Sequence, residues 1–258
     1  MARTDLELLL EAAKRLAAVI LENGGETYRA EEAARRLCGL CGTQEIDVLA
    51  LPTGVLVHMT AKDGKTYSAL ARVRTRRLDL GAVARANEIA RRLAGREMLP
   101  ADALRELSAP QGQEETGRLL TPALSAFSIG CFSVLMGGGV FEFFAAAACA
   151  FLSQLVCSLF RDADLYYFIT SLAGGVVCAL AAVLAISMFG TGSLSVIIGS
   201  AILPLLPGMT LIGAIRDSVR GDLVSGAARL GDVLVVLLSL SFGVGAVLWC
   251  YGWIGGAL

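Results

Sequence analysis

The chain has 258 residues, with 22 Lys and Arg, 23 Asp and Glu, and a formal net charge of -1. Hydrophobic residues make up 55% of the sequence and charged residues 17%, whereas a soluble domain averages roughly 45–50% apolar and about 25% charged residues. These values exclude a disordered chain, a basic nucleic-acid-binding protein and a disulfide-rich secreted module, and they favour a membrane protein.

The charged residues are concentrated in the N-terminal part of the chain. Residues 1–118 contain 18 of the 22 basic and 17 of the 23 acidic residues. We therefore expect a soluble domain followed by a membrane domain. The expected boundaries are 1–107 for an α+β domain, 108–118 for a linker and 119–258 for the transmembrane domain.

The N-terminal part shows helical periodicity, then strand periodicity, then helical periodicity again. Gly24 and Gly25 end the first expected helix, and Thr27 is placed to cap the second. Asp63-Gly64 predicts a tight hairpin turn, because these residues adopt positive φ angles readily. The order indicates an α+β domain on an antiparallel three-stranded sheet. The expected helices are 5–23, 28–40, 79–93 and 101–107, and the expected strands are 46–49, 55–60 and 66–73.

The C-terminal part consists of long uncharged stretches. A bilayer core of ~30 Å requires about 20 apolar helical residues. The stretch 165–215 is too long for one helix, and it divides at 189–193, where the composition is typical of a turn. We therefore predict an α-helical multi-pass membrane protein with five transmembrane helices. The expected spans are 119–139, 141–160, 165–188, 193–214 and 231–254.

The basic residues near these spans predict the orientation. Cytoplasmic loops are enriched in Lys and Arg. Five Arg lie next to or between the expected spans, and all five fall on the cytoplasmic side of the membrane if residues 1–118 are cytoplasmic. The C-terminus then lies outside. No apolar segment follows Met1, so we expect no signal peptide. The five residues are Arg118, Arg161, Arg216, Arg220 and Arg229.

The sequence contains few signals for catalysis or cofactor binding. Cys38 and Cys41 form a C-x-x-C pattern, but the chain has one His and no second cysteine pair, so a zinc site of four ligands is not readily completed. No serine-hydrolase, nucleotide-binding or zinc-protease motif is present. We expect no enzyme activity, no metal and no cofactor.

Several short motifs, taken together, resemble the threonine/serine exporter family over nearly the whole chain. In the N-terminal part these are residues 24–31, Pro52-Thr53-Gly54, Asn87 and Arg91. In the membrane part they are Gly137–Gly139 with Glu142, residues 204–208, Asp217 and residues 221–226.

The resemblance implies export of small carboxylate metabolites across a bacterial inner membrane. Threonine/serine-type amino acids and succinate-type dicarboxylates are both open as substrates. The chain is similar to the large subunit of the split, two-component type, which is related to a paired succinate exporter. This implies a second small multi-pass membrane subunit, in a hetero- or homo-oligomer. A membrane-anchored scaffold or regulatory subunit that conducts no solute is the alternative.

The fourth expected span contains the candidate substrate site. Pro204 and Pro207 each remove a backbone donor, and Gly208 permits a break in the helix. Transporters bind substrates at broken helices, and a half-helix starting after Gly208 would direct its N-terminal amides at a carboxylate. Thr210 adds a hydroxyl. A simple packing kink is the alternative.

Two further groups of residues are candidates for coupling and gating. Glu142 lies near the outer end of the second span, where an acid can carry protons for antiport; a hydrated loop residue is the alternative. Charges of alternating sign in the inner loop, together with residues at the start of the second helix, suggest gating or docking, with solvated ion pairs as the alternative. These gating candidates are Glu26, Thr27, Arg29, Glu31, Arg216, Asp217, Asp222 and Arg229.

Overall fold

The computed structural model describes residues 3–74, 78–109, 120–161 and 167–253. The chain forms two compact units. The first comprises Met1–Gln113 and Thr210–Leu230, and the second comprises Glu114–Met209 and Gly231–Leu258. Residues 210–230, which the sequence analysis assigned to the transmembrane part, therefore pack with the N-terminal unit.

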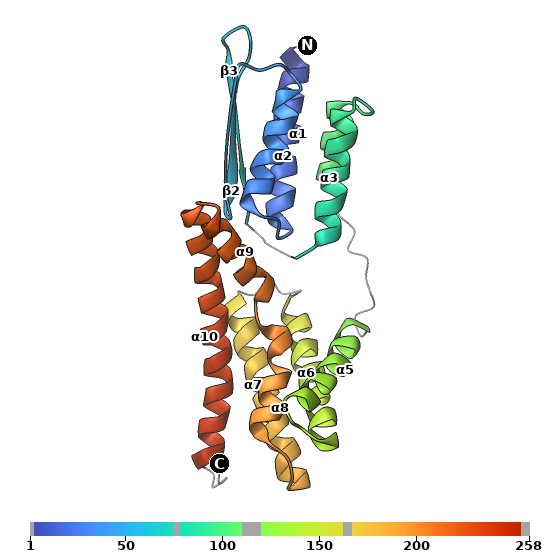
Figure 1. Ribbon diagram of the computed structural model, residues 1–258, viewed down its shortest axis with the longest axis vertical. Helices are drawn as coiled ribbons and strands as arrows, with labels where there is room; N and C mark the ends of the chain where they lie inside the picture. The colour runs from blue at the N-terminus through green and yellow to red at the C-terminus, as the bar shows by residue number, and fades with distance from the viewer. Residues whose placement is uncertain (1–2, 75–77, 110–119, 162–166, 254–258) are drawn as a thin grey trace. The chain divides into compact units, whose positions relative to one another are not determined.

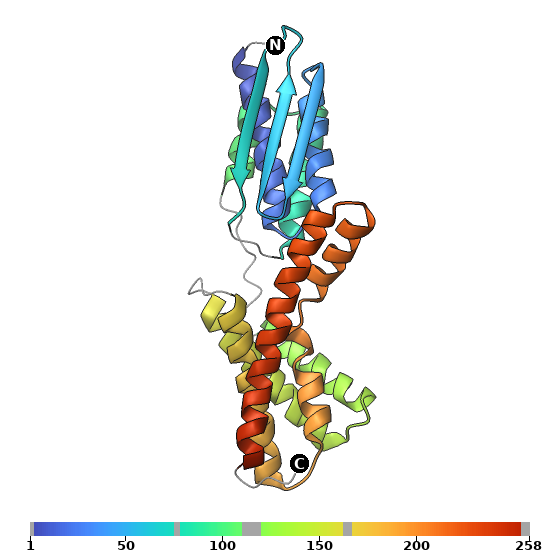
Figure 2. The ribbon, with the colours of Figure 1, turned by 90° about the vertical axis from the view of Figure 1, so that its left-hand side faces the viewer.

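The N-terminal unit is an α+β fold, as predicted. Three antiparallel strands lie in the order β1-β2-β3, and the helices lie on one side of the sheet (Figure 2). The hairpin between β2 and β3 turns at Gly64, whose φ is +79°. The elements are α1 (Arg3–Glu22), α2 (Thr27–Gly39), β1 (Glu45–Leu51), β2 (Gly54–Thr60), β3 (Thr66–Arg72), α3 (Leu80–Ala94) and α4 (Pro100–Ser108).

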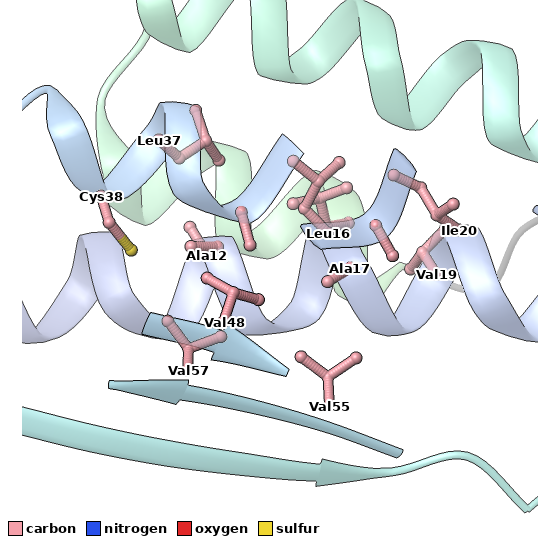
Figure 3. Packing of buried hydrophobic residues seen from close by; sticks show 14 of the residues in the cluster. Ala12, Leu16, Ala17, Val19, Ile20, Leu37, Cys38, Val48, Val55 and Val57 are labelled. Atoms are coloured by element: carbon pink, nitrogen blue, oxygen red, sulfur yellow. The ribbon is translucent and has the colours of Figure 1, made fainter. Parts of the chain in front are cut away.

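The core of this unit lies between the sheet on one side and the helices α1 and α2 on the other (Figure 3). Alternate residues of β2 point into it, because side chains along a strand alternate between its two faces. Val55 and Val57 are at most 1% exposed, and Leu16 and Leu37 of the helices belong to the same buried cluster. Burying a large aliphatic side chain of this kind stabilises the fold by about 1.5–3 kcal/mol.

The connection between α1 and α2 depends on two adjacent glycines. The N–H of Gly25 donates to the carbonyl of Ile20, and the N–H of Gly24 donates to the carbonyl of Leu21. These bonds form a Schellman motif with Gly24 at φ +82°. A Cβ on Gly25 would lie 2.7 Å from the Ile20 carbonyl oxygen. Both positions therefore favour glycine, and α1 ends where the sequence predicts.

The start of α2 differs from its prediction. Thr27 is the first residue of the helix, and the N-cap position is occupied by Glu26 without a side-chain capping bond. The expected capping role of Thr27 is therefore wrong. In contrast, Asp79 at the start of the expected helix 79–93 caps α3, because its Oδ1 accepts the N–H of Ala82 at 2.8 Å.

The second unit is helical and apolar. Its small side chains allow close packing, which is typical of membrane helices. A Cβ on Gly175 of α7 would lie 2.7 Å from a carbonyl oxygen of α10, and one on Gly243 of α10 would lie 2.5 Å from a carbonyl oxygen of α7. The helices of this unit (Figure 1) are α5 (Leu120–Leu135), α6 (Val140–Arg161), α7 (Tyr167–Phe189), α8 (Leu194–Ala201) and the part of α10 (Leu223–Trp253) from Gly231 onward. Most of α9 (Gly208–Val219) and the start of α10 belong to the first unit.

Three of these helices are long and apolar enough to cross a membrane: Val140–Phe160, Phe168–Phe189 and Leu223–Trp253. The number is four if Leu194–Leu205 and Gly208–Val219, which are bent by 61°, form one broken span. The described part of the first expected span, Leu120–Leu135, has 16 residues and a length of about 24 Å. The number of five spans stays a prediction.

The last helix begins earlier than expected. The sequence predicted a span over residues 231–254, whereas α10 starts at Leu223. Arg229, which the sequence analysis assigned to a loop, therefore lies within a helix. Its charge is accommodated there because it contacts a carboxylate of α9, as described below.

Candidate functional site

Within the first unit, the turn that begins α2 contacts the hairpin formed by α9 and the start of α10. At the centre of this contact, Thr27 Oγ1 donates to Asp217 Oδ1 at 3.0 Å. Arg229 Nη2 donates to the carbonyl oxygen of Gly25 at 2.8 Å. The Asp217 side chain is completely buried and that of Arg229 is 9% exposed. We call the contact between residues 25–29 and 216–229 the turn–hairpin site.

Asp217 and Arg229 form a buried ion pair. Arg229 Nε lies 2.9 Å from Asp217 Oδ2, but the N–H does not meet hydrogen-bond geometry toward this oxygen. The contact is therefore electrostatic, and the directional bonds of the two side chains go to Gly25 and Thr27. Breaking a buried pair by removing one partner costs about 3–5 kcal/mol, because the other charge is left buried and uncompensated.

The rim of the site carries three further contacts. Glu26 forms ion pairs with both Arg29 and Arg216. The guanidinium carbon of Arg220 lies 3.6 Å from the centre of the Tyr28 ring, a cation–π arrangement. Each of the four residues 25–28 therefore contacts a residue of the hairpin.

The hairpin itself is shaped by residues of the Gly221–Gly226 motif. Gly221 ends α9 with φ +91°, and Asp222 Oδ1 accepts the N–H of Ser225 at 3.1 Å at the start of α10. A Cβ on Gly226 would lie 2.1 Å from Ser218 Oγ, so a larger residue would push the two helices apart. The carboxylate of Asp222 thus caps a helix of the hairpin.

Glu31 lies outside the turn–hairpin site. Its Oε1 accepts the N–H of Ala50 at 2.9 Å, which joins α2 to β1 inside the α+β fold. The structure therefore brings six of the eight gating candidates together at the turn–hairpin site: Glu26, Thr27, Arg29, Arg216, Asp217 and Arg229.

The break expected in the fourth span is present. A short 3-10 helix, Leu203–Leu205, follows α8 and contains Pro204, and α9 starts at Gly208. Pro207 and Thr210 are half-buried. The first N–H groups of a helix have no partner within it, so the start of α9 offers backbone donors.

Glu142 lies in the first turn of α6 and is half-buried. Its Oε2 accepts the N–H of Gly139 at 2.8 Å, and its Oε1 accepts the N–H of Ser193 at 3.1 Å. Ser193 is the N-cap residue of α8. One carboxylate therefore joins the starts of two helices that are 51 positions apart in the chain.

Three residues of the turn–hairpin site, Gly25, Tyr28 and Arg220, were not predicted as site residues from the sequence. Gly25 acts through its carbonyl oxygen, which has no sequence signature. Tyr28 lies within the motif of residues 24–31 but was not named as a site residue, and Arg220 belongs to the same run of alternating charges as Arg216. An aromatic residue within a charged turn was the available signal for the Tyr28–Arg220 contact. No cluster of three or more potential metal ligands occurs within the described ranges.

Comparisons with known proteins cover almost the whole chain. The family model described as "Putative threonine/serine exporter" matches residues 11–251. A protein of Escherichia coli K12 named "Probable succinate transporter subunit YjjP" is 23% identical over 237 residues, which are 90% of this chain and 91% of that protein. A Mycobacterium tuberculosis protein named "Probable threonine/serine exporter" is 25% identical over 243 residues, which are 92% of this chain and 45% of that protein. No solved structure matches.

Proposed function

Because the chain belongs to the threonine/serine exporter family, whose members are transporters and not enzymes, we propose that it is a subunit of a bacterial inner-membrane exporter of small carboxylate metabolites. The observation that carries this proposal is the broken helix at Leu203–Gly208, which is bent by 61°. Interrupted helices of this kind bind substrates in transporters, because their ends present unpaired backbone groups.

The proposed substrate site uses the start of α9. The free N–H groups after Gly208 and the positive end of the helix dipole attract a carboxylate, and the hydroxyl of Thr210 adds one donor or acceptor. Pro204 and Pro207 keep the two helical segments separate, because each lacks an N–H. The names of the relatives include succinate and threonine/serine transport, and these solutes share a carboxylate group.

We assign proton coupling to Glu142 and gating to the turn–hairpin site. A carboxylate near the membrane surface can exchange protons with the outer solution. The contacts of residues 25–28 with residues 216–229 connect the α+β fold to the segment that continues directly from the broken helix. Any movement of the α+β fold would therefore act on α9.

Efflux from proteoliposomes tests the proposal. Vesicles are loaded with labelled succinate, threonine or serine, with and without a pH gradient, and with and without a small multi-pass partner subunit. The partner is included because a relative is named as a transporter subunit. Release of one solute that requires both chains supports a two-component exporter. Absence of release from folded, correctly oriented protein in the presence of the partner contradicts the proposal.

A scaffold or regulatory subunit without its own transport path is the second candidate. It is favoured by the extent of the α+β unit, which includes residues 210–230 and thus part of the apolar half of the chain. The same assay, repeated with variants in α9, separates the two candidates. If the chain is a scaffold, it changes the flux through its partner, but substitutions in α9 do not change which solute is released.

A further inference from the structure

One face of the three-stranded sheet is exposed at its centre, whereas the helices of the α+β unit lie on the opposite face (Figure 2). Three leucines form a row across this exposed face. Leu49 is directly opposite Leu56 in the pairing of β1 with β2, and Leu56 is directly opposite Leu70 in the pairing of β2 with β3. They are 53%, 42% and 70% exposed, respectively. Single exposed leucines are common on protein surfaces, but a contiguous apolar patch is typical of an interaction site.

Charged residues flank the leucine row in a symmetrical pattern. Strands β1 and β3 run in the same direction, because each is antiparallel to β2. Two acids precede the leucine of β1 by two and four residues, and two arginines follow the leucine of β3 by two and four residues. Because side chains alternate along a strand, all four lie on the leucine side of the sheet. They are Asp47, Glu45, Arg72 and Arg74, and all four are exposed.

The acids therefore lie at one corner of the face, and the arginines lie at the diagonally opposite corner. The alternation continues past the end of β3, because Val73, between the two arginines, is buried and its N–H donates to the carbonyl of Thr53. The other outward positions of the three strands carry no Asp, Glu, Lys or Arg. The two corners are consequently not neutralised by neighbours on the face.

These four charges also have no ion-pair partner elsewhere in the part of the chain that the structure describes. Charged side chains on the helices of the same unit do pair, as in Glu32 with Arg36 and Arg15 with Glu22. The two corners of the sheet face are thus open to charges of opposite sign on another molecule.

We propose that this face binds the same face of a second copy of the chain. The two-fold axis passes between the two sheets at Leu56, perpendicular to the line that joins the two charged corners. It sets the leucines of one copy against those of the other and brings each acidic corner to the arginine corner of the partner, because the two corners are equally far from Leu56 in the register. Two-fold contacts use one self-complementary patch on both subunits, and sheets commonly pack face to face.

The charge pattern favours a second copy over two other occupants. An anionic lipid surface would attract the arginine corner, but it would repel the acidic corner of the same face. A different protein could cover the leucines, but it would not require acids and arginines at equal spacings on opposite sides of the row. Equal spacing is the condition for a surface that complements itself.

The size of the face predicts a contact that depends on the membrane. Each strand has seven residues, so the face measures about 14 by 24 Å, or roughly 340 Å². Stable interfaces bury about 800 Å² on each partner. Two chains anchored in one membrane have a raised effective concentration, so the pairing is expected between full chains that share a bilayer. The same unit contains residues 210–230, so this pairing also joins two copies of the hairpin formed by α9 and the start of α10.

Disulfide crosslinking of the full chain in proteoliposomes tests the proposal. Leu56→Cys places a thiol at the two-fold axis, and mild oxidation with copper phenanthroline traps paired copies as a dimer on a non-reducing gel. Leu99→Cys is the matched control, because Leu99 is a 68% exposed leucine of the same unit outside the sheet. The unsubstituted chain reports any crosslinking through its own seven Cys. We expect Leu56→Cys to crosslink about tenfold faster than Leu99→Cys, because pairing raises the effective concentration of the thiols.

Charge reversal in the Leu56→Cys chain identifies the contacts between copies. Asp47→Arg or Arg72→Asp alone places like charges opposite each other at both corners of the pair, so we expect each to slow crosslinking about tenfold. Both positions are exposed, so the fold is retained. When the two variant chains are reconstituted together, the mixed pair has opposite charges at both corners, and we expect the rate to recover.

Three outcomes overturn the proposal. The first is equal crosslinking of Leu56→Cys and Leu99→Cys, and the second is a mixture of the two charge variants that crosslinks no faster than either variant alone. The third is crosslinking of Leu56→Cys to a co-reconstituted small membrane subunit instead of to itself, which assigns the face to that subunit. The crosslinking is measured without any solute, so this proposal and the proposed export function can fail separately.

Discussion

The hydroxyl of Thr27 donates a 3.0 Å hydrogen bond to Asp217 Oδ1, although 190 positions separate the two residues in the chain. Both residues are 1% exposed. The other carboxylate oxygen of Asp217 lies against Arg229. Thr27 therefore donates to one oxygen of a buried carboxylate, and the ion pair with Arg229 compensates the charge at the other oxygen.

Thr27→Val tests the importance of this hydrogen bond. Valine has nearly the shape of threonine but has no donor, so a buried carboxylate oxygen loses its partner. We expect the free energy of unfolding to fall by about 1.5–3 kcal/mol, the range for a hydrogen bond to a charged group. Thermal unfolding of the full chain in detergent measures the change. Thr27→Ser retains the hydroxyl, and an equal loss in both variants would show that the methyl group is what matters.

A double-mutant cycle tests the ion pair between Asp217 and Arg229. We expect Asp217→Asn and Arg229→Gln each to destabilise the fold by about 3–5 kcal/mol, because each leaves a buried charge without its partner. We expect the double variant to lose less than the sum, with a coupling energy of about 0.5–3 kcal/mol.

The exposed pair Glu88–Arg91 is a matched control for this cycle. Its side chains are 52% and 77% exposed, so its coupling energy should be about 0–1 kcal/mol. Coupling between Asp217 and Arg229 that is no larger than this would contradict a stabilising role of the buried pair.

Local signals in the sequence were sufficient to predict much of the fold. Gly24 and Asp79 mark helix ends through bonds within five residues, and Gly64 marks a turn in the same way. The turn–hairpin site was less predictable, because its central contact joins Thr27 to Asp217 across 190 residues. Thr27 was assigned to a capping bond because a threonine before a helical pattern usually makes one.

The boundary of α10 shows a similar limit. Hydropathy placed the start of the last span at residue 231, after Arg229, since an isolated charge is unfavourable in an apolar helix. Arg229 continues the helix because Asp217 neutralises it. Only the three-dimensional contact reveals this compensation, so hydropathy alone placed the start of the last span eight residues after the start of α10.

Burial raises the pKa of the Cys38 thiol to about 12, and neighbouring Cys41 adds to the effect. We therefore expect Cys38 to resist alkylation by iodoacetamide at pH 8, where it is almost entirely protonated and has no exposed surface. Cys41 is half-buried and should react faster. Mass spectrometry of the full chain after timed alkylation measures both rates.

The same pKa shift predicts the direction of a pH effect on stability. The folded state retains the Cys38 proton above the ordinary thiol pKa of about 8.5, whereas the unfolded state loses it. The stabilising contribution is therefore complete below this pKa and declines as pH rises toward 12. Cys38→Ala should reduce the decline, and an equal decline in both proteins would contradict the buried thiol as its source.

Pro207→Ala and Thr210→Ala test the proposed substrate site. Alanine at 207 restores a backbone N–H and favours a continuous helix, and alanine at 210 removes the hydroxyl from the start of α9. We expect both variants to reduce efflux in proteoliposomes while the amount of inserted protein stays the same. Thr210→Ser should retain most of the flux. Unchanged flux in both alanine variants would favour a packing kink over a binding site.

Glu142→Gln tests proton coupling separately from structure. The glutamine side chain keeps an acceptor oxygen for Gly139 or Ser193 but has no titratable proton. We expect the variant to fold and insert but to lose the dependence of efflux on an imposed pH gradient. Efflux measured at equal and at unequal pH across the vesicle membrane provides the comparison.

Glu142→Ala is the control for the structural contribution of this carboxylate. It leaves both N–H groups without the side-chain acceptor that joins the starts of α6 and α8, so we expect it to lower the free energy of unfolding by about 0.5–1.5 kcal/mol. A glutamine variant that keeps the full pH-gradient response would assign Glu142 to this structural role alone. Loss of the gradient response with retained downhill efflux would identify its carboxylate as the group that carries the proton.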